Sequence, residues 1–307
     1  MVVASFVAFL LLGLFTYYTT AFTKVLVPAV YNEYVNESMP DWLISEEFQQ
    51  KRGYSVFLYQ KFHPDKPNYL PHNRGSETGP YLQYIVDHYD DFPDVAMFVH
   101  AKPSDHQPHF LELLDCVSPN ATYININFNY QGCRRSDHWK LPVGLWVEQC
   151  WRETLKVLWG LENDLPEFNK RLPPHKVLMV CFVYSHQFIL SRSAVHRRPL
   201  DVWKKLLHML GSDDVCHAGE PDYENLFAFQ KARERVGPEP SELDAEGEGA
   251  RFGVKGWGRT IQGGTAEHLA HVIYGHYDLD MEYPNMDVIC QNFLPGFPHS
   301  PCHRRPG

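Results

Sequence analysis

The sequence predicts a single mixed α/β domain with a mostly parallel central sheet and helices on both faces. Residues 95–99 are five apolar residues between a turn and a polar loop, a pattern typical of a strand buried on both sides. Residues 77–89 carry apolar side chains at helical spacing, and a helix joined to a buried strand by so short a link is typical of a β-α-β unit. With 307 residues, 44% of them hydrophobic, the chain can bury one large core without a second domain.

The other elements follow from the same periodicity rules. We expect strands or extended segments at residues 24–30, 55–60, 177–184 and 187–190, and a half-buried edge strand at the alternating residues 123–129. We expect helices at residues 110–114, 147–161 and 200–210, the last closed by Gly211, and a final helix from Thr265, as N-cap, to about Gly275. Residues 236–264 are rich in Gly, Glu and Pro and predict a loose insertion. The predicted domain spans residues 25–290, with a C-terminal tail at 291–307.

The N-terminus and the cysteines predict the secretory pathway. Residues 2–22 hold no charge, so residues 1–24 are expected to be an uncleaved signal anchor in the membrane or a signal peptide cut after Ala21. Asn36 and Asn120 lie in glycosylation acceptor tripeptides. The seven cysteines lack a C-x-x-C pair, which disfavours a structural zinc site and leaves one to three disulfides. We therefore expect a location in the membrane or lumen of the endoplasmic reticulum or Golgi, or secretion.

The overall charge argues against nucleic acid as a partner. A net charge of −9 gives no general attraction to phosphate backbones. The sequence also lacks a nucleophilic Ser or Cys motif, a phosphate-cradling Gly-rich loop and a dinucleotide fingerprint. Kinase, esterase and dehydrogenase functions are therefore disfavoured.

Several separated motifs resemble a known family. They are Tyr31-Asn32-Glu33, Asn73-Arg74-Gly75-Ser76-Glu77, Ile85-Val86-Asp87-His88-Tyr89-Asp90, Pro93-Asp94-Val95 with Phe98, Phe188-Ile189-Leu190-Ser191-Arg192, and Glu267-His268. Together they resemble a widespread uncharacterised family known as domain of unknown function 3431. The pattern is also similar to glycosyltransferases of the GT-A type, which implies a GT-A-like three-layer sandwich and a nucleotide-sugar donor. The usual Asp-x-Asp metal motif is missing here, because residues 95–99 lead into His100-Ala101-Lys102 instead.

Ligands of parallel sheets gather beyond the carboxyl ends of the strands, so the loops after residues 30 and 99 are the expected site. The first loop offers Tyr31, Asn32 and Glu33 for substrate, or simply a capped strand end. The second offers Asp105 for catalysis, Lys102 for a diphosphate, and His100, His106 and His109 for Mn or another divalent metal, although loop histidines are also common in solvent.

Three further residues are candidates from other parts of the chain. Arg74 precedes a helix N-terminus and suits a phosphate, although Ser76 and Glu77 alone fit an ordinary helix start. Arg192 is predicted to face a diphosphate or to lie in a solvated basic turn. Glu267 is a candidate general base for an acceptor hydroxyl, or a helix-start acid.

The predicted function is a glycosyltransferase-like protein that transfers sugar from a nucleotide donor to a glycan or protein acceptor. One alternative is a non-catalytic lumenal module that binds glycans or polypeptides, favoured by the missing Asp-x-Asp. Another is a metal-dependent hydrolase built on residues 100–109.

Overall fold

The computed structural model describes residues 22–30, 33–34, 36–59, 64–70, 77–127, 130–135, 143–174, 178–183, 186–211, 262–275, 279 and 286–294. Its elements in chain order are β1 (Lys24–Ala29), α2 (Asp41–Ile44), α3 (Glu46–Arg52), β2 (Ser55–Val56), α4 (Thr78–Asp87), β3 (Val95–His100), the 3₁₀ turn η1 (Pro103–Asp105), α5 (Phe110–Asp115), β4 (Tyr123–Asn125), β5 (Tyr130–Arg135), α6 (Val143–Trp159), α7 (Leu165–Arg171), β6 (Met179–Val183), β7 (Phe188–Ser191), α8 (Arg192–Val195), α9 (Leu200–Gly211), α14 (Ala270–Ile273) and α15 (Met286–Gln291). Residues 262–268 are also helical.

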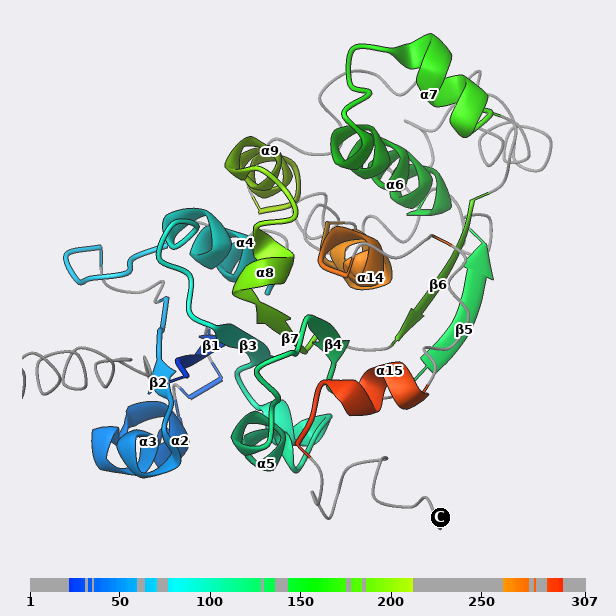
Figure 1. Cartoon of the computed structure of the whole chain (residues 1–307). Coiled ribbons are helices and arrows are strands. Elements are labelled where there is room, and N and C mark those ends of the chain that lie inside the picture. The colour runs from blue at the N-terminus through cyan, green and yellow to red at the C-terminus, as the bar shows by residue number, and fades with distance from the viewer. Residues whose placement is uncertain are drawn as a thin grey trace, which may run out of the picture.

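The main sheet has five strands in the order β2-β1-β3-β7-β4. β1 pairs in parallel with both β2 and β3, whereas β7 runs antiparallel between β3 and β4 (Figure 1). Because β4 opposes β7, it runs with β3, and four of the five strands share one direction. The mixed α/β fold with a mostly parallel sheet is therefore confirmed, and β4 is the edge strand that its sequence predicted.

Helices cover both faces of this sheet, as expected. Alternate strand residues point to opposite sides: Val27, Phe98 and Phe188 belong to one buried cluster, and Leu26, Met97 and Ile189 belong to the other. Figure 1 shows α4, α9 and α14 on one side of the strands and α5 and α15 on the other. Both faces of β4 are covered, since Tyr123 and Ile124 are each buried. The prediction of a half-buried strand there was wrong for that reason.

Local signals explain how the helices form. Ser45 caps α3 by accepting a hydrogen bond from the Phe48 N–H at 3.2 Å, and acidic residues 46–47 follow in the first turn. Basic residues 51–52 and Gly53, at φ 67°, close the same helix.

Two glycines let α4 and α9 pack closely. A Cβ at Gly211, the last residue of α9, would lie 3.2 Å from the Cα of Gly79 in α4. Trp203, Leu206 and Leu210 on the buried stripe of α9 complete this contact with the core. The helix expected at residues 200–210 is thus confirmed, and it packs against α4.

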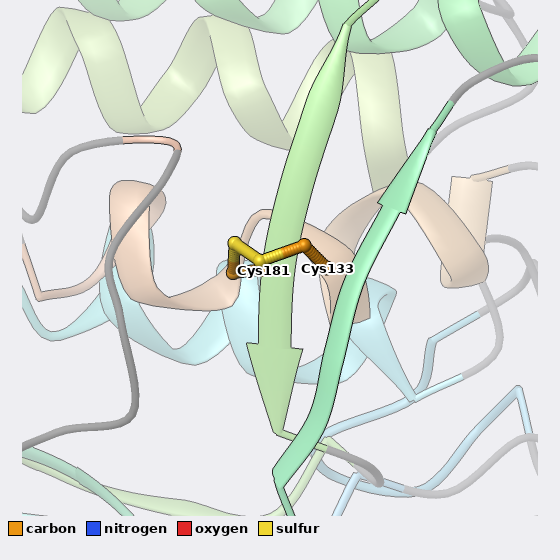
Figure 2. Close-up of a disulfide and its surroundings, with 2 residues drawn as sticks. All are labelled: Cys133 and Cys181. Carbon is orange, nitrogen blue, oxygen red and sulfur yellow. A yellow bond between two sulfur atoms is a disulfide. The ribbon is translucent and has the colours of Figure 1, made fainter.

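A two-stranded sheet, β5 with β6, stands beside the main sheet (Figure 1). Cys133 and Cys181 occupy opposed positions of this antiparallel pair and form a disulfide (Figure 2). Cys150 and Cys290 are also disulfide-bonded, and Cys116 is a free thiol. The prediction that the cysteines form disulfides is confirmed for the part of the chain that the structure describes.

Several element boundaries differ from the prediction. β2 has two residues instead of six and β4 has three instead of seven, while α6 begins at Val143 instead of residue 147. The segment that contains Thr265 is already helical at residue 262, so Thr265 lies inside it, fully buried, and is not its N-cap. It is not the last helix either, because α15 follows it. Propensity and periodicity mark the middle of an element better than its ends.

The described part of the domain runs from β1 to residue 294. Asn292 and Phe293, beyond the predicted domain end at 290, are buried, and Phe293 bridges to Val117. The N-terminal segment and nearly all of the predicted insertion lie outside the described residues. Among the helices that the structure does describe, none combines the length and the apolar character needed to cross a bilayer.

Candidate functional site

The chain path defines a topological switch point between β1 and β3. From β1 the chain passes through α3, whose Phe48 packs on the cluster around Leu26, to β2 on one side. It then returns through α4, in the opposite cluster, to β3 on the other side of β1. In open α/β sheets ligands bind beyond the carboxyl ends of strands at such a point. We call the carboxyl ends of β1 and β3, with residues 33, 34, 36, 37 and 101–106, the switch edge.

The two loops of the switch edge are tied together directly. The Tyr34 hydroxyl donates a hydrogen bond to the Ala101 carbonyl oxygen. The Lys102 ammonium lies 2.9 and 2.8 Å from the two carboxylate oxygens of Glu37, and 5.8 Å from the centroid of the Tyr34 ring. These contacts join residues about 65 positions apart, so the loops after β1 and β3 form one surface as the parallel-sheet argument predicted.

The switch edge is predominantly acidic. Burial first, and then Glu33, Glu37 and Asp105, raise the pKa of Tyr34 above 10.0. The hydrogen bond that Lys102 donates to Glu37 is the main cause that raises the pKa of Lys102, with smaller contributions from the charges of Asp105 and Glu33. Glu33 and Asp105 therefore act on the same two side chains. The structure brings together these two residues, which the sequence predicted for substrate binding and catalysis.

Gln187 fixes the end of β3 against its neighbours. Its side-chain oxygen accepts the His100 backbone N–H at 3.0 Å, and its amide nitrogen donates to Asn127 Oδ1 at 3.1 Å. The Gln187 backbone carbonyl accepts from the Ile126 N–H at 3.0 Å. Because β7 is antiparallel to β3, Gln187 at the start of β7 lies beside the carboxyl end of β3. A fully buried amide thus sets the backbone position of His100.

Glu77, at the start of α4, approaches two imidazoles at this edge. Its Oε1 lies 3.6 Å from His100 Nε2 and 3.9 Å from His186 Nδ1. His186 Nδ1 also lies 3.5 Å from the Thr78 hydroxyl oxygen. The His106 ring stands edge-on to His100, with centroids 5.2 Å apart. Residues from α4, β3, η1 and the start of β7 thus form one group, which we call the Glu77 cluster: Glu77, Thr78, His100, His106 and His186.

The imidazoles of the Glu77 cluster differ in their environment. Burial lowers the pKa of His186 to about 4, and the His100 ring adds to that effect while Glu77 opposes it. Burial is also the main cause that lowers the pKa of His106, followed by His100. His186 is therefore uncharged at neutral pH, and its contact with Glu77 is one between a neutral ring and a carboxyl group.

The structure separates Arg192 from the switch edge. Its guanidinium lies 3.6 Å from Asp94 Oδ1, and its Nε donates to the Phe92 carbonyl. Ser191 is in register with Val95, the first residue of β3. Since β7 runs against β3, Arg192 follows the end of β7 at the opposite edge of the sheet. The predicted contact of Arg192 with a diphosphate at the switch edge does not fit this position.

The remaining candidates lie in three kinds of place. Tyr31, Asn32 and Arg74 are outside the described residues. Glu267 is half-buried in the helical segment 262–268, beside His268, whose ring stands edge-on to Trp151 of α6. His109 precedes α5, and its backbone N–H donates to Gln107.

The predicted histidine metal site does not form as a group of ligands. Among the described residues, which include His100, His106 and His109, no three His, Cys, Asp or Glu side chains come close enough together to hold a metal ion. The spacing of these histidines matched no established metal motif, and His109 lies in the segment leading to α5.

Sequence reasoning missed three residues of this site. Glu77 was assigned only to the helix start, and His186 and Gln187 were not singled out. The available signal was a His-Gln pair interrupting the apolar residues 177–190. Its meaning depended on the reversed direction of β7, which places both residues at the switch edge.

Comparisons with known proteins identify the family. Residues 30–220, more than half of the chain, match the family described as Protein of unknown function (DUF3431). No curated protein and no solved structure matches the chain. The matched segment contains β3, β7, the switch edge after β1 and the Glu77 cluster. The chain therefore belongs to this family of proteins of unknown function (DUF3431), as its motifs indicated.

Proposed function

We propose that the chain is a glycosyltransferase of the secretory pathway that transfers a sugar from a nucleotide donor to a glycan or protein acceptor. The observation that carries the proposal is the meeting of two acidic loops at the topological switch point between β1 and β3. A switch point is where α/β sheets bind nucleotides. The resemblance of the motifs to GT-A glycosyltransferases supports the same reading.

The charges of the switch edge favour a cation-bridged donor. The charges of Glu33, Glu37 and Asp105 all act on the Lys102 ammonium. Such a surface repels a bare diphosphate but attracts one that carries Mn or Mg. These cations are commonly held by one or two carboxylates together with substrate phosphates. The protein therefore has no need to supply three metal ligands of its own, and Asp105 with Glu33 is the proposed pair.

Three features support a lumenal site of action. Cys133 and Cys181 are bonded to each other, and Cys150 and Cys290 are also in disulfides, which persist in oxidising compartments. The acceptor residues Asn36 and Asn120 are both exposed. The charge-free residues 2–22 provide the proposed membrane anchor or signal peptide.

Thermal shift with UDP or GDP, each with and without Mn, tests the proposal. We expect the nucleotide with Mn to raise the melting temperature more than either alone, because the cation bridges phosphate and carboxylates. Asp105→Asn should weaken this effect, and Glu112→Gln, a half-buried carboxylate of α5, should leave it unchanged. Stabilisation by Mn alone would favour the hydrolase, and no stabilisation would favour a non-catalytic binding module.

A further inference from the structure

Helix capping does not explain the carboxylate of Glu77. Glu77 occupies the N-cap position of α4, but its side chain makes no capping hydrogen bond there. The carboxyl group instead approaches His100 and His186, at 3.6 and 3.9 Å. Its side chain is 19% exposed and that of His100 is 25% exposed. Part of the Glu77 side chain is therefore accessible to solvent.

Behind Glu77 lies a buried set of polar atoms. Tyr81 Oη, His186 Nε2 and Tyr274 Oη are buried and have no hydrogen-bond partner among the described residues. The His186 ring centroid is 5.4 Å from that of Tyr81 and 5.7 Å from that of Tyr274. Burial raises the pKa of both tyrosines well above 10.0, and the charge of Glu77 adds to this for each. The two tyrosines thus lie around the His186 ring, and the charge of Glu77 acts on all three side chains.

Buried polar atoms without a hydrogen-bond partner lower the stability of the fold. Each buried polar atom without a partner destabilises a fold by about 1–3 kcal/mol. Polar atoms of this kind in native structures call for an explanation such as catalysis or bound water. Three such atoms near one partly exposed carboxylate support a catalytic role for this region.

We infer that Glu77 is the general base that takes the proton from the acceptor hydroxyl, with His100 and His186 as positioning residues. The inference rests on the proposed glycosyltransferase function and assigns its base. In this assignment Glu77 is the catalytic residue, since its carboxylate takes up the proton of the reacting hydroxyl.

The reaction requires only the nucleotide-sugar donor and the acceptor. The acceptor oxygen attacks the anomeric carbon of the sugar as its proton moves to Glu77 Oε1. The bond between that carbon and the diphosphate oxygen breaks, and the nucleoside diphosphate leaves with the electron pair. The proton on Glu77 is then released to solvent, which restores the carboxylate.

Glu77 suits this role better than the two bases expected from the sequence. Asp105 is exposed beside Lys102 and Glu37, a position that suits a cation and a diphosphate. Glu267 lies in the segment whose His268 packs on Trp151. Glu77 instead is partly exposed and lies beside two imidazoles, of which His186 is uncharged at neutral pH.

Release of nucleoside diphosphate from a panel of UDP- and GDP-linked hexoses, with water as acceptor, tests the base. We expect Glu77→Gln to lower the release rate by about 100-fold or more, as for loss of a general base. UDP or GDP binding with Mn, measured by calorimetry, should stay unchanged. Glu112→Gln should keep the full rate. Should Glu77→Gln not fold, Glu77→Asp, which keeps the charge but withdraws the carboxylate, should lose rate in the same way.

The positioning residues need a readout of their own. His186→Asn should lower kcat, leave KM for the donor unchanged, and move the acidic limb of the pH–rate profile. The titratable groups that interact with Glu77, and so influence this profile, are His100, His106, His186, Tyr81 and Tyr274.

The outcomes separate the base from the function. If wild-type protein binds neither nucleotide, the proposed function falls. If it binds nucleotide and Glu77→Gln releases diphosphate at the wild-type rate, the base assignment alone is overturned. The same holds if Glu267→Gln rather than Glu77→Gln abolishes release. If wild-type protein binds nucleotide but cleaves no donor, the transferase function falls and the base assignment falls with it.

Discussion

Replacing His186 should make the protein less sensitive to mild acid. His186 is fully buried, and burial lowers its pKa from 6.5 to about 4. The unfolded chain binds a proton at this residue below about pH 6.5, whereas the folded protein does not until about pH 4. The stability that His186 provides is therefore fully present above pH 6.5 and is lost as the pH falls toward 4.

The size of the effect follows from the two pKa values. At 1.36 kcal/mol per pKa unit, the difference between 6.5 and about 4 corresponds to about 3 kcal/mol in total. Linkage places about 2 kcal/mol of this loss between pH 7 and pH 5. That interval lies above the ordinary pKa of most carboxyl groups, so their protonation contributes little to it.

Urea unfolding of wild type and His186→Asn at pH 7, 6 and 5 measures this. Asn keeps a polar group near Nδ1, beside Thr78, but does not titrate. The variant is expected to be less stable at pH 7 yet to lose about 2 kcal/mol less than wild type on going to pH 5. His208→Asn, on the exposed side of α9, should keep the wild-type slope. Equal slopes for wild type and His186→Asn would refute the reasoning.

Two further changes test what stabilises the fold. Arg152 is buried, pairs with Glu148 at 2.9 Å and donates to the carbonyls of residues 172–174, so Arg152→Met should cost about 3–5 kcal/mol in urea unfolding. Adding Glu148→Leu should restore part of that loss, because it removes the buried carboxylate that pairs with Arg152. Replacing both Cys133 and Cys181 with Ser should cost about 2–4 kcal/mol, since their bond closes a loop of 48 residues. A melting temperature unchanged by this double substitution would contradict the expectation.

The sequence predicted the fold well where the composition of a segment alone determines its secondary structure. Residues 95–99 had to be a buried strand because five apolar residues allow no exposed face, and β3 is buried at all five. The helix before it was equally well marked, and α4 covers residues 78–87 of the predicted 77–89. The partner of each strand and its direction were harder to predict. Nothing in residues 188–191 distinguishes a strand parallel to β3 from one antiparallel to it, because a strand buried on both sides has the same composition in either case.

The site was predictable to the extent that it depends on β1 and β3. The parallel-strand argument brought Glu33 and Asp105 to one edge, and both act on Tyr34 and Lys102. The three predicted histidine ligands form no metal-binding group among the described residues, because proximity in the sequence does not bring side chains together in space. Three histidines within ten residues have to converge on one point to bind a metal, and the 3₁₀ turn η1 intervenes between His100 and the start of α5 at His109.

The direction of β7 decides which residues belong to the site. A strand parallel to β3 would have placed its end, Ser191, and hence Arg192, beside His100 at the switch edge. In the antiparallel arrangement Ser191 pairs with Val95 at the far edge, and the start of β7 comes to the switch edge instead. Because β7 runs antiparallel to β3, the switch edge contains His186 and Gln187 instead of the Arg192 guanidinium. An exposed cation suited to a diphosphate is replaced by a buried neutral imidazole beside Glu77, so this part of the site is better suited to moving a proton than to binding an anion.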